Sequence, residues 1–383
     1  MANHIQRQVN AMNICEQSPS YIRAIAPYQP GKPISELARE MGLDEGRIIK
    51  LASNENPLGM SPKARAAIEH ALGDLARYPD GNAFELKAAL ASRYGLAPEC
   101  IVVGNGSNDL LELVAGAFLT PGSASIYSQH AFAVYPLATQ ARGARGIVVP
   151  ARNYGHDLGA MLAAITPETR LIFVANPNNP TGTFLASADI DAFLSKVPRD
   201  VVVVLDEAYN EYLPPELRFN SARWLERQDN LVITRTFSKA YGLAGLRVGY
   251  GLMKPEVADL LNRVRQPFNV NSLALAAAHA ALADQAFVDQ SYALNRAGMA
   301  QLEAGFRALG LSWIASSGNF ISFALPDENG KPGAATVYQK LLRQGVIVRP
   351  VAGYEMPRHL RVTIGTQAEN QAFLDVLKVS LPA

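Results

Sequence analysis

A lysine with unusual neighbours is the first candidate for chemistry in this sequence. Lys239 lies in the segment TFSKAYGLAGLRVG at 236–249, directly after the apolar stretch Leu231–Thr234. The small hydroxyl-bearing and glycine residues around it leave room for a bound cofactor. A lysine removed from water at such a place has a lowered pKa, which suits Schiff-base chemistry. A lone loop lysine is more simply a solvated charge, so Lys239 needs partners to count as functional.

Three further segments supply such partners, and each follows an apolar stretch. Asp206 comes after VVVVL and begins DEAY. A buried carboxylate there requires a cation such as a protonated pyridine nitrogen, although Asp206 could instead cap a helix. Asn179 lies in NPNNPTG, a turn made rigid by two prolines and a glycine. The loop GNGSN presents free amides and a helix N-terminus at Ser107 and Asn108, which suits a phosphate.

The four segments together are far more specific than any one of them. Each supplies one part of a site for pyridoxal phosphate, whose ring accepts electrons when its nitrogen is held positive. Tyr209, in DEAY, could donate a hydrogen bond to the phenolic oxygen of that ring. The glycine loop is not a dinucleotide fingerprint because its third glycine is missing, and no GxxxxGK[ST] motif occurs. A nicotinamide-dependent dehydrogenase is therefore disfavoured.

The elements that must position these residues form an α/β pattern. Apolar, β-branched stretches occur at 100–103, 123–127, 146–149, 170–175, 201–205 and 231–234. Helical stretches are expected at 63–75, 84–94, 107–119 and 273–282. Strands that are apolar throughout are typical of parallel sheets covered on both faces. We therefore predict a mainly parallel sheet between helices, with ligands at the carboxyl ends of its strands.

The C-terminal part has a different pattern. A long helix at 287–309 precedes strands at 320–325, 346–349 and 360–364, with helices at 335–343 and from 367 onward. This order predicts a smaller α+β lobe, against which the N-terminal stretch should pack. The predicted division is a large domain at 52–285 and a second unit formed by 1–51 with 286–383.

Composition narrows the class of partner. The chain has 383 residues, of which 49% are hydrophobic and 18% charged, so it can bury enough surface to fold. Its formal charge of +1 gives no reason to expect a nucleic acid or an anionic membrane as partner. Cys15 and Cys100 belong to no metal-binding or disulfide pattern, and no export signal or membrane span is evident. We predict a cytoplasmic protein that acts on small molecules without a metal.

These segments, in this order, resemble those of the fold type I, aspartate-aminotransferase-like enzymes. Within that group the chain is most similar to the histidinol-phosphate aminotransferases. The resemblance runs from PYQPGKP at Pro27 through SNENPLG, RYPD, NPNNPTG, DEAY and TFSKAYGLAGLRVG to LRVTIG at Leu360. It implies a large domain with a seven-stranded, mainly parallel sheet, pyridoxal 5'-phosphate as cofactor and transaminase activity. The implied reaction converts L-histidinol phosphate to imidazole acetol phosphate, with 2-oxoglutarate as amino acceptor.

Other activities share this ancestry. An aromatic amino-acid aminotransferase would have the same cofactor residues and a different pocket, and a threonine-phosphate decarboxylase is also related. An aminotransferase-like transcriptional regulator would need a DNA-binding domain ahead of SNENPLG. The roughly fifty residues there contain no helix-turn-helix pattern.

The resemblance also implies roles for individual residues. Lys239 would carry the cofactor and shuttle the proton, Asp206 would pair with the pyridine nitrogen, and Asn179 and Tyr209 would bond the phenolic oxygen. Phe132 would stack on the ring. The implied phosphate contacts are Ser107, Asn108, Thr236, Ser238 and Arg247.

The remaining implied roles concern the substrate and a second subunit. Tyr78 in RYPD resembles the tyrosine that reaches the cofactor phosphate of the neighbouring subunit, which implies a homodimer with shared sites. Arg361 in LRVTIG resembles the arginine that forks onto a substrate carboxylate, a task that suits a guanidinium. Arg349 would be a second anion contact. The residues expected at the substrate entrance are Tyr28, Asn54 and Asn56.

Overall fold

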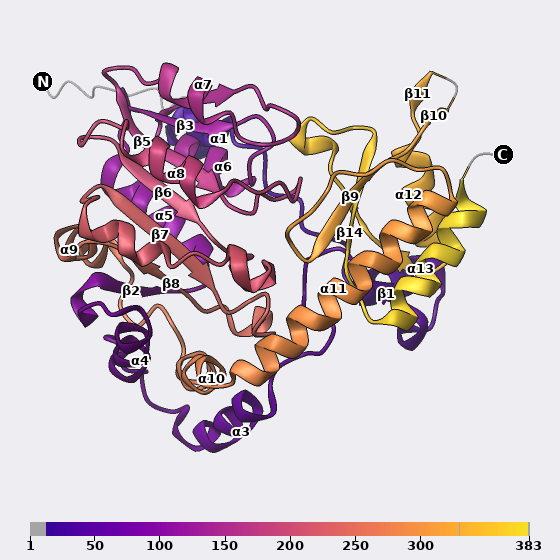
Figure 1. Cartoon of the computed structure of the whole chain (residues 1–383), viewed down its shortest axis with the longest axis horizontal. Helices are drawn as coiled ribbons and strands as arrows, with labels where there is room; N and C mark the ends of the chain where they lie inside the picture. Colours follow the sequence, from indigo (N-terminus) through magenta and orange to yellow (C-terminus); the bar gives the residue numbers. More distant parts are fainter. Residues whose placement is uncertain (1–12, 329, 382–383) are drawn as a thin grey trace, which may run out of the picture.

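Two lobes joined by one long helix make up the molecule (Figure 1). The structure is a computed structural model that describes residues 13–328 and 330–381. The joining helix, α11 (Gln285–Ala308), starts beside α10 and extends into the small lobe. Val288 near its start belongs to the large-lobe core, and Phe306 near its end belongs to the small-lobe core. The helix therefore fixes the distance between the lobes.

The large lobe is built on a seven-stranded sheet. Its strands are β2 (Ile101–Gly104), β3 (Ala124–Ser128), β4 (Arg145–Val149), β5 (Thr169–Ala175), β6 (Val202–Asp206), β7 (Leu231–Thr236) and β8 (Gly249–Leu252). They are arranged in the order β2-β8-β7-β6-β5-β3-β4. β8 runs antiparallel to β2 and β7, and the other six strands all run in one direction. The prediction of a mainly parallel sheet is confirmed, and β2, β5, β6 and β7 all end at the same edge.

Helices cover both faces of this sheet. They are α3 (Pro62–Ala71), α4 (Phe84–Tyr94), α5 (Ser107–Phe118), α6 (Val134–Ala141), α7 (Leu158–Ala163), α8 (Ser187–Leu194), α9 (Pro255–Val264) and α10 (Ser272–Leu282).

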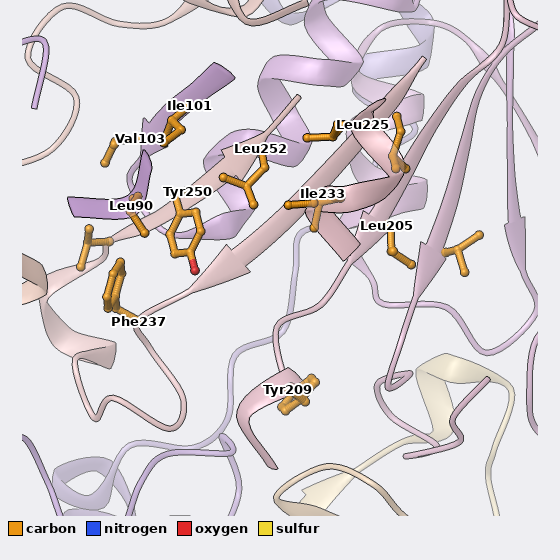
Figure 2. Packing of buried hydrophobic residues seen from close by; sticks show 14 of the residues in the cluster. Leu90, Ile101, Val103, Leu205, Tyr209, Leu225, Ile233, Phe237, Tyr250 and Leu252 are labelled. Carbon is orange, nitrogen blue, oxygen red and sulfur yellow. The ribbon is translucent and has the colours of Figure 1, made fainter. Parts of the chain in front are cut away.

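The central strand β6 shows why its sequence is apolar throughout. Val203 and Leu205 belong to one buried cluster, which includes Ala274 of α10. Figure 2 shows Leu205 among other members of this cluster. Val204 faces the opposite cluster, together with Leu110 of α5. Alternate side chains of a strand point to opposite faces, so a strand covered on both faces must be apolar at every position. Because β6 is packed on both faces, the position of its C-terminal end is fixed, and Asp206 lies at that end.

The small lobe combines short sheets with helices. Its strands are β1 (Ile49–Lys50), β9 (Phe320–Ala324), β10 (Asp327–Glu328), β11 (Lys331–Pro332), β12 (Val346–Ile347), β13 (Arg349–Pro350) and β14 (His359–Thr363). The helices packed with them are α2 (Ile34–Met41), α12 (Ala334–Arg343) and α13 (Gln367–Ser380). The antiparallel order β13-β14-β9 places Arg349 directly opposite Arg361. This pairing brings two cationic side chains to one edge of the lobe.

The N-terminal stretch contacts both lobes. β1 pairs in parallel with β12, and Leu37 of α2 packs with Leu342 and Ile347 of the small lobe. Here the structure also differs from the expected arrangement, because α1 (Ser20–Arg23) lies against α6 of the large lobe. Tyr21 fits there because Gly143 lacks a side chain, and a Cβ at that position would lie 2.9 Å from the tyrosine ring. The domain boundaries near 51 and 285 remain a prediction.

Candidate active site

A cavity of about 200 Å³ lies where the carboxyl ends of the parallel strands face the small lobe. Ala175, Asp206 and Thr236, the last residues of β5, β6 and β7, all line it. Of the predicted site residues, all except Asn56 and Tyr78 line this cavity. Residues scattered along more than 300 positions of the chain are therefore brought to one place by the sheet and by β13 and β14.

Lys239 reaches the cavity from the loop after β7. Its Nζ donates a hydrogen bond to the backbone oxygen of Ser53, at 3.0 Å. Burial and, to a smaller extent, the positive charge of Arg361 together lower the pKa of Lys239 from 10.5 to about 7. Near neutral pH a large fraction of this amine is therefore unprotonated and nucleophilic, whereas an ordinary lysine is almost entirely protonated.

Asp206 forms the floor of the cavity. Its Oδ2 accepts a hydrogen bond from the Tyr135 hydroxyl at 2.8 Å, and its Oδ1 accepts one from Thr234 at 3.1 Å. Burial raises the pKa of this carboxyl, since no cation neutralises it among the described residues. A positively charged group entering the cavity would stabilise the carboxylate strongly.

Two hydrogen-bonding side chains stand beside this floor. The hydroxyl of Tyr209 accepts a hydrogen bond from Asn54 Nδ2 at 2.9 Å. Burial raises the pKa of Tyr209 to about 12, so its hydroxyl keeps its proton at neutral pH. Asn179 Oδ1 accepts a hydrogen bond from the guanidinium of Arg361. Phe132, which makes an edge contact with Tyr135, completes this part of the wall.

The start of α5 forms a cradle for an anion. Gly106 precedes the helix with φ 80°, a conformation that favours glycine. A Cβ there would lie 2.6 Å from a guanidinium nitrogen of Arg247, so the glycine also permits this close approach. Arg247 in turn donates a hydrogen bond to Ser238 Oγ at 3.3 Å. The residues gathered in this cradle are Ser107, Asn108, Thr236, Ser238 and Arg247.

The small lobe contributes two arginines. Arg361 is buried, donates to the backbone oxygen of Ala52 at 2.8 Å and lies over the ring of Phe320. Its Nε has no hydrogen-bond partner within the described part of the chain. Arg349 donates to the backbone oxygen of Gln29 at 2.6 Å and to the Tyr28 hydroxyl at 3.3 Å. Both guanidiniums are therefore placed to bind an anionic ligand.

The family follows from the sequence match. Residues 46–377 match the family model described as aminotransferase class I and II. The chain is a class I and II aminotransferase. It is 62% identical to histidinol-phosphate aminotransferase 2 of Nitrosospira multiformis, over 97% of this chain and 93% of that protein. It is 65% identical to histidinol-phosphate aminotransferase of Methylobacillus flagellatus, over 94% and 96% of the two chains.

Solved structures confirm the fold of this aminotransferase. The histidinol-phosphate aminotransferase of Sinorhizobium meliloti, crystallised in complex with pyridoxal-5'-phosphate, superposes with a TM-score of 0.87. The two proteins share 28% identity over 95% of this chain and 97% of that chain. An aspartate aminotransferase of Thermus thermophilus has the same fold, with a TM-score of 0.82 at 22% identity over 95% and 99% of the chains. The predicted fold type I architecture is confirmed.

The cavity of this aminotransferase fits pyridoxal phosphate. Asp206 is a buried carboxylate that lacks a cation, and Lys239 is an amine with a lowered pKa. Gly106 leaves the space in which a phosphate can reach both the helix N-terminus and Arg247. The carboxylate, the amine and the phosphate space would each serve a different part of the cofactor, and the cavity contains all three.

Two predicted site residues lie outside the cavity. Asn56 is buried, and its Nδ2 donates to the backbone oxygen of Ala240 at 2.9 Å and to Ser291 at 2.8 Å. Asn56 therefore does not line the cavity, and its amide instead holds the loop that carries Lys239. A role for Asn56 in substrate binding stays a prediction. Tyr78 is 83% exposed and stacks on Phe268, with ring centroids 4.8 Å apart.

Sequence reasoning missed two tyrosines of the site. Tyr135 bonds Asp206 from a helix 71 positions away, and Tyr354 lines the cavity from a loop of the small lobe. One signal for Tyr135 existed, since it stands three positions after the predicted ring contact Phe132, in the first turn of α6. Nothing in the sequence around Tyr354 separates it from an ordinary buried tyrosine.

Several predicted absences concern the rest of the molecule. In the part of the chain that the structure describes, no helix is long and apolar enough to cross a membrane. Within residues 13–328 and 330–381, no group of three His, Cys, Asp or Glu side chains could hold a metal ion. Cys15 and Cys100 are both free thiols.

Proposed function

We propose that this aminotransferase transfers the amino group of L-histidinol phosphate to 2-oxoglutarate, as a step of histidine biosynthesis. The observation that carries the substrate assignment is the identity of 62% and 65% to proteins of that name, over more than nine-tenths of each chain. The cavity supports it, because an amine with a lowered pKa, a buried carboxylate and a cradle for an anion all line it.

Pyridoxal phosphate, when bound, supplies an aldehyde that takes up the amino group and a ring that accepts the electrons left on the substrate carbon. Lys239 is the group that moves the proton. Its neutral Nζ would take the proton from the substrate carbon and return it to the cofactor carbon on the other side of the transferred nitrogen. With its pKa lowered to about 7, it can act as base and then as acid near neutral pH.

The surrounding residues hold the ring. Asp206 keeps the pyridine nitrogen positive, Tyr209 and Asn179 bond the phenolic oxygen, and Phe132 covers one face. The cradle at the start of α5 holds the phosphate with Arg247. These roles are proposals that rest on the positions of the side chains in the cavity.

The substrate pocket is cationic. Arg361 and Arg349 face the cavity from paired positions of β14 and β13. Histidinol phosphate carries a phosphate and no carboxylate, whereas 2-oxoglutarate carries two carboxylates. One pair of arginines must therefore accept both anions in turn, which a planar guanidinium can do because phosphate and carboxylate oxygens both match its donors.

Initial rates of the purified holoenzyme test this function. Histidinol phosphate, phenylalanine and tyrosine are supplied in turn, each with 2-oxoglutarate, and glutamate formation is measured. We expect the highest kcat/KM with histidinol phosphate. A preference for phenylalanine or tyrosine would identify an aromatic amino-acid aminotransferase and would contradict the proposed substrate.

We further propose that the enzyme is a cytoplasmic homodimer whose sites are shared between subunits. Three exposed aromatic side chains support a homodimer, because exposed apolar surface often marks contacts between proteins. Tyr78, Phe84 and Phe268 are 83%, 74% and 47% exposed, and Tyr78 stacks on Phe268. Sedimentation or light scattering of the holoenzyme gives the mass, and twice that of the 41.3 kDa chain is expected. A monomer would contradict the shared site.

A further inference from the structure

Asn54 makes more hydrogen bonds than a residue at a substrate entrance requires. It is 1% exposed, and its φ of 55° lies in the left-handed region that asparagine and aspartate tolerate best among side-chain-bearing residues. Its backbone nitrogen donates to Thr363 Oγ1 at 2.9 Å, and its oxygen accepts from Asn319 at 3.1 Å. We propose that Asn54 and Thr363 are positioning residues that aim the hydroxyl proton of Tyr209 into the cavity.

The direction of each hydrogen bond in this chain can be worked out. A backbone N–H can only donate, so Thr363 Oγ1 accepts from Asn54 N. Thr363 then has one proton to give. Asn54 Oδ1, at 3.2 Å, is its hydrogen-bond acceptor, and the described residues offer it no other. The amide oxygen of Asn54 must therefore face Thr363, and the amide nitrogen must face Tyr209.

That orientation decides where the Tyr209 proton points. Asn54 Nδ2 can only donate, so the Tyr209 oxygen accepts at this contact of 2.9 Å. The proton of Tyr209 has to point elsewhere, and the cavity that Tyr209 lines is the open direction. In the opposite amide orientation, Tyr209 would give its proton to Asn54, and the buried Thr363 hydroxyl would lose its acceptor.

The same strand links this chain to the substrate pocket. Thr363 and Arg361 are two positions apart on β14, so their side chains share one face of the strand. Arg361 pairs with Ser322 of β9, and Thr363 pairs with Phe320. The strand that holds the anionic substrate thus also orients the tyrosine that faces the cofactor. This inference rests on the proposed function, because the group that receives the proton is the phenolic oxygen of pyridoxal phosphate.

The test is a pH titration of the visible absorbance of the holoenzyme. A donor to the phenolic oxygen favours its anionic form, so loss of that donor raises the pH midpoint of the spectral change. Asn54→Asp keeps the size and the permitted φ, but its carboxylate accepts from both Thr363 and Tyr209 and turns the tyrosine proton away. We expect the midpoint to rise by about one to two pH units.

The new negative charge also raises the midpoint, so Asn54→Asp is measured again in a Tyr209→Phe background. The shift must be larger when the tyrosine hydroxyl is present. Equal shifts in the two backgrounds would mean that the charge acts alone, which is the result expected if the amide has the opposite orientation. No shift in either background would mean that Asn54 does not influence the phenolic oxygen at all. Each of these results overturns the inference.

Thr363 supplies an uncharged version of the test. Thr363→Val removes the hydroxyl at constant shape and should raise the midpoint, whereas Thr363→Ser should leave it near that of the wild type. Equal effects of the two substitutions would point to packing and would overturn the inference. If the wild-type protein with pyridoxal phosphate shows no visible band at all, the proposed function fails as well, so the two failures are distinguishable.

Discussion

The cofactor side and the substrate side of the cavity are built in different ways. On the cofactor side, Asp206 ends β6 directly and Lys239 follows three residues after β7. On the substrate side, Arg361 and Arg349 are held by backbone oxygens of Ala52 and Gln29, more than 300 residues away in sequence. One side is fixed by local strand geometry, and the other by contacts between distant segments.

The two sides of the cavity should therefore tolerate substitution differently. The ends of doubly covered strands can hardly move, because shifting one would disturb the packing on both faces of the sheet. The substrate side depends on where the N-terminal segment and the small lobe meet. Removal of a single side chain on the cofactor side should therefore abolish the chemistry. Removal of one on the substrate side should only weaken substrate binding, by an amount that differs from residue to residue.

The largest effect is expected at Lys239. Lys239→Ala removes both the attachment point of the cofactor and the proton carrier, so activity should fall by at least about 10⁴-fold. The visible absorbance band that depends on the bond between Lys239 and the cofactor should disappear. Circular dichroism should show an unchanged fold, since the side chain reaches into a cavity.

The matched control is Lys63→Ala, which removes an exposed lysine that lines no part of the cavity and should leave activity and spectrum unchanged. A Lys239→Ala protein with a normal band and normal turnover would refute the assignment of Lys239.

The second effect tests the floor of the cofactor side. Asp206→Asn keeps the shape and the bond to Tyr135, but an amide cannot hold the pyridine nitrogen protonated as a carboxylate does. We expect cofactor binding to survive and kcat to fall on the order of 10³-fold. Asp191→Asn, at an exposed ion pair with Arg227, is the control. Turnover close to that of the wild type would reduce Asp206 to a capping residue.

The same contrast explains what could be predicted from the sequence. Asp206 ends a strand, Ser107 starts a helix and Asn179 follows a strand by four residues, so apolar patterning and the types of the residues after each strand together pointed to them. β8 was missed because Gly249 and Gly251 weaken its strand pattern. Glycine is needed at 249 because a Cβ would lie 2.5 Å from the Ser107 nitrogen. The opposition of Arg349 and Arg361 depends on strand register in the small lobe, which local sequence does not encode.

Asn56 shows the limit of placing residues by their neighbourhood. It stands two positions from Asn54 in SNENPLG, yet only Asn54 lines the cavity. The amide of Asn56 instead bonds Ala240, next to Lys239 in the chain. Which of two nearby asparagines meets the cavity depends on the backbone turn at Asn54, where φ is 55°.

The third effect concerns the substrate side. Arg361→Ala removes a buried guanidinium and should weaken both half-reactions by about 2–3 kcal/mol, on the order of 10²-fold in kcat/KM. Arg349→Ala should cost less, because that side chain is only half-buried. Arg361→Lys keeps the charge without the planar fork and should give an intermediate value. A loss confined to one half-reaction would show that the two anions bind at different places.

A smaller effect follows from the pKa of Lys239. In the cofactor-free protein its value of about 7 lies below the ordinary 10.5, so the reactive neutral amine is gained as the pH rises through 7. The rate of reconstitution with pyridoxal phosphate should fall about tenfold for each pH unit below that midpoint and level off above it. Stopped-flow absorbance measures this rate. A midpoint near 10 would mean that burial does not perturb the amine.

The last prediction asks whether the cofactor side is complete within one chain. Tyr78 lines no part of the cavity and is 83% exposed, so its implied contact with the cofactor phosphate requires a second subunit. A Tyr78→Phe chain mixed with a Lys239→Ala chain gives heterodimers in which one site carries both lesions and the other carries neither. Random exchange of equal amounts leaves about a quarter of all sites intact. Activity should therefore rise above the mean of the two parent proteins once the subunits exchange, which light scattering of tagged chains can follow.

The contradicting result requires that exchange is complete and that Tyr78→Phe alone is impaired. If no activity returns under these conditions, each subunit must build its site alone. The cofactor side, like the substrate side, would then be formed entirely within one chain.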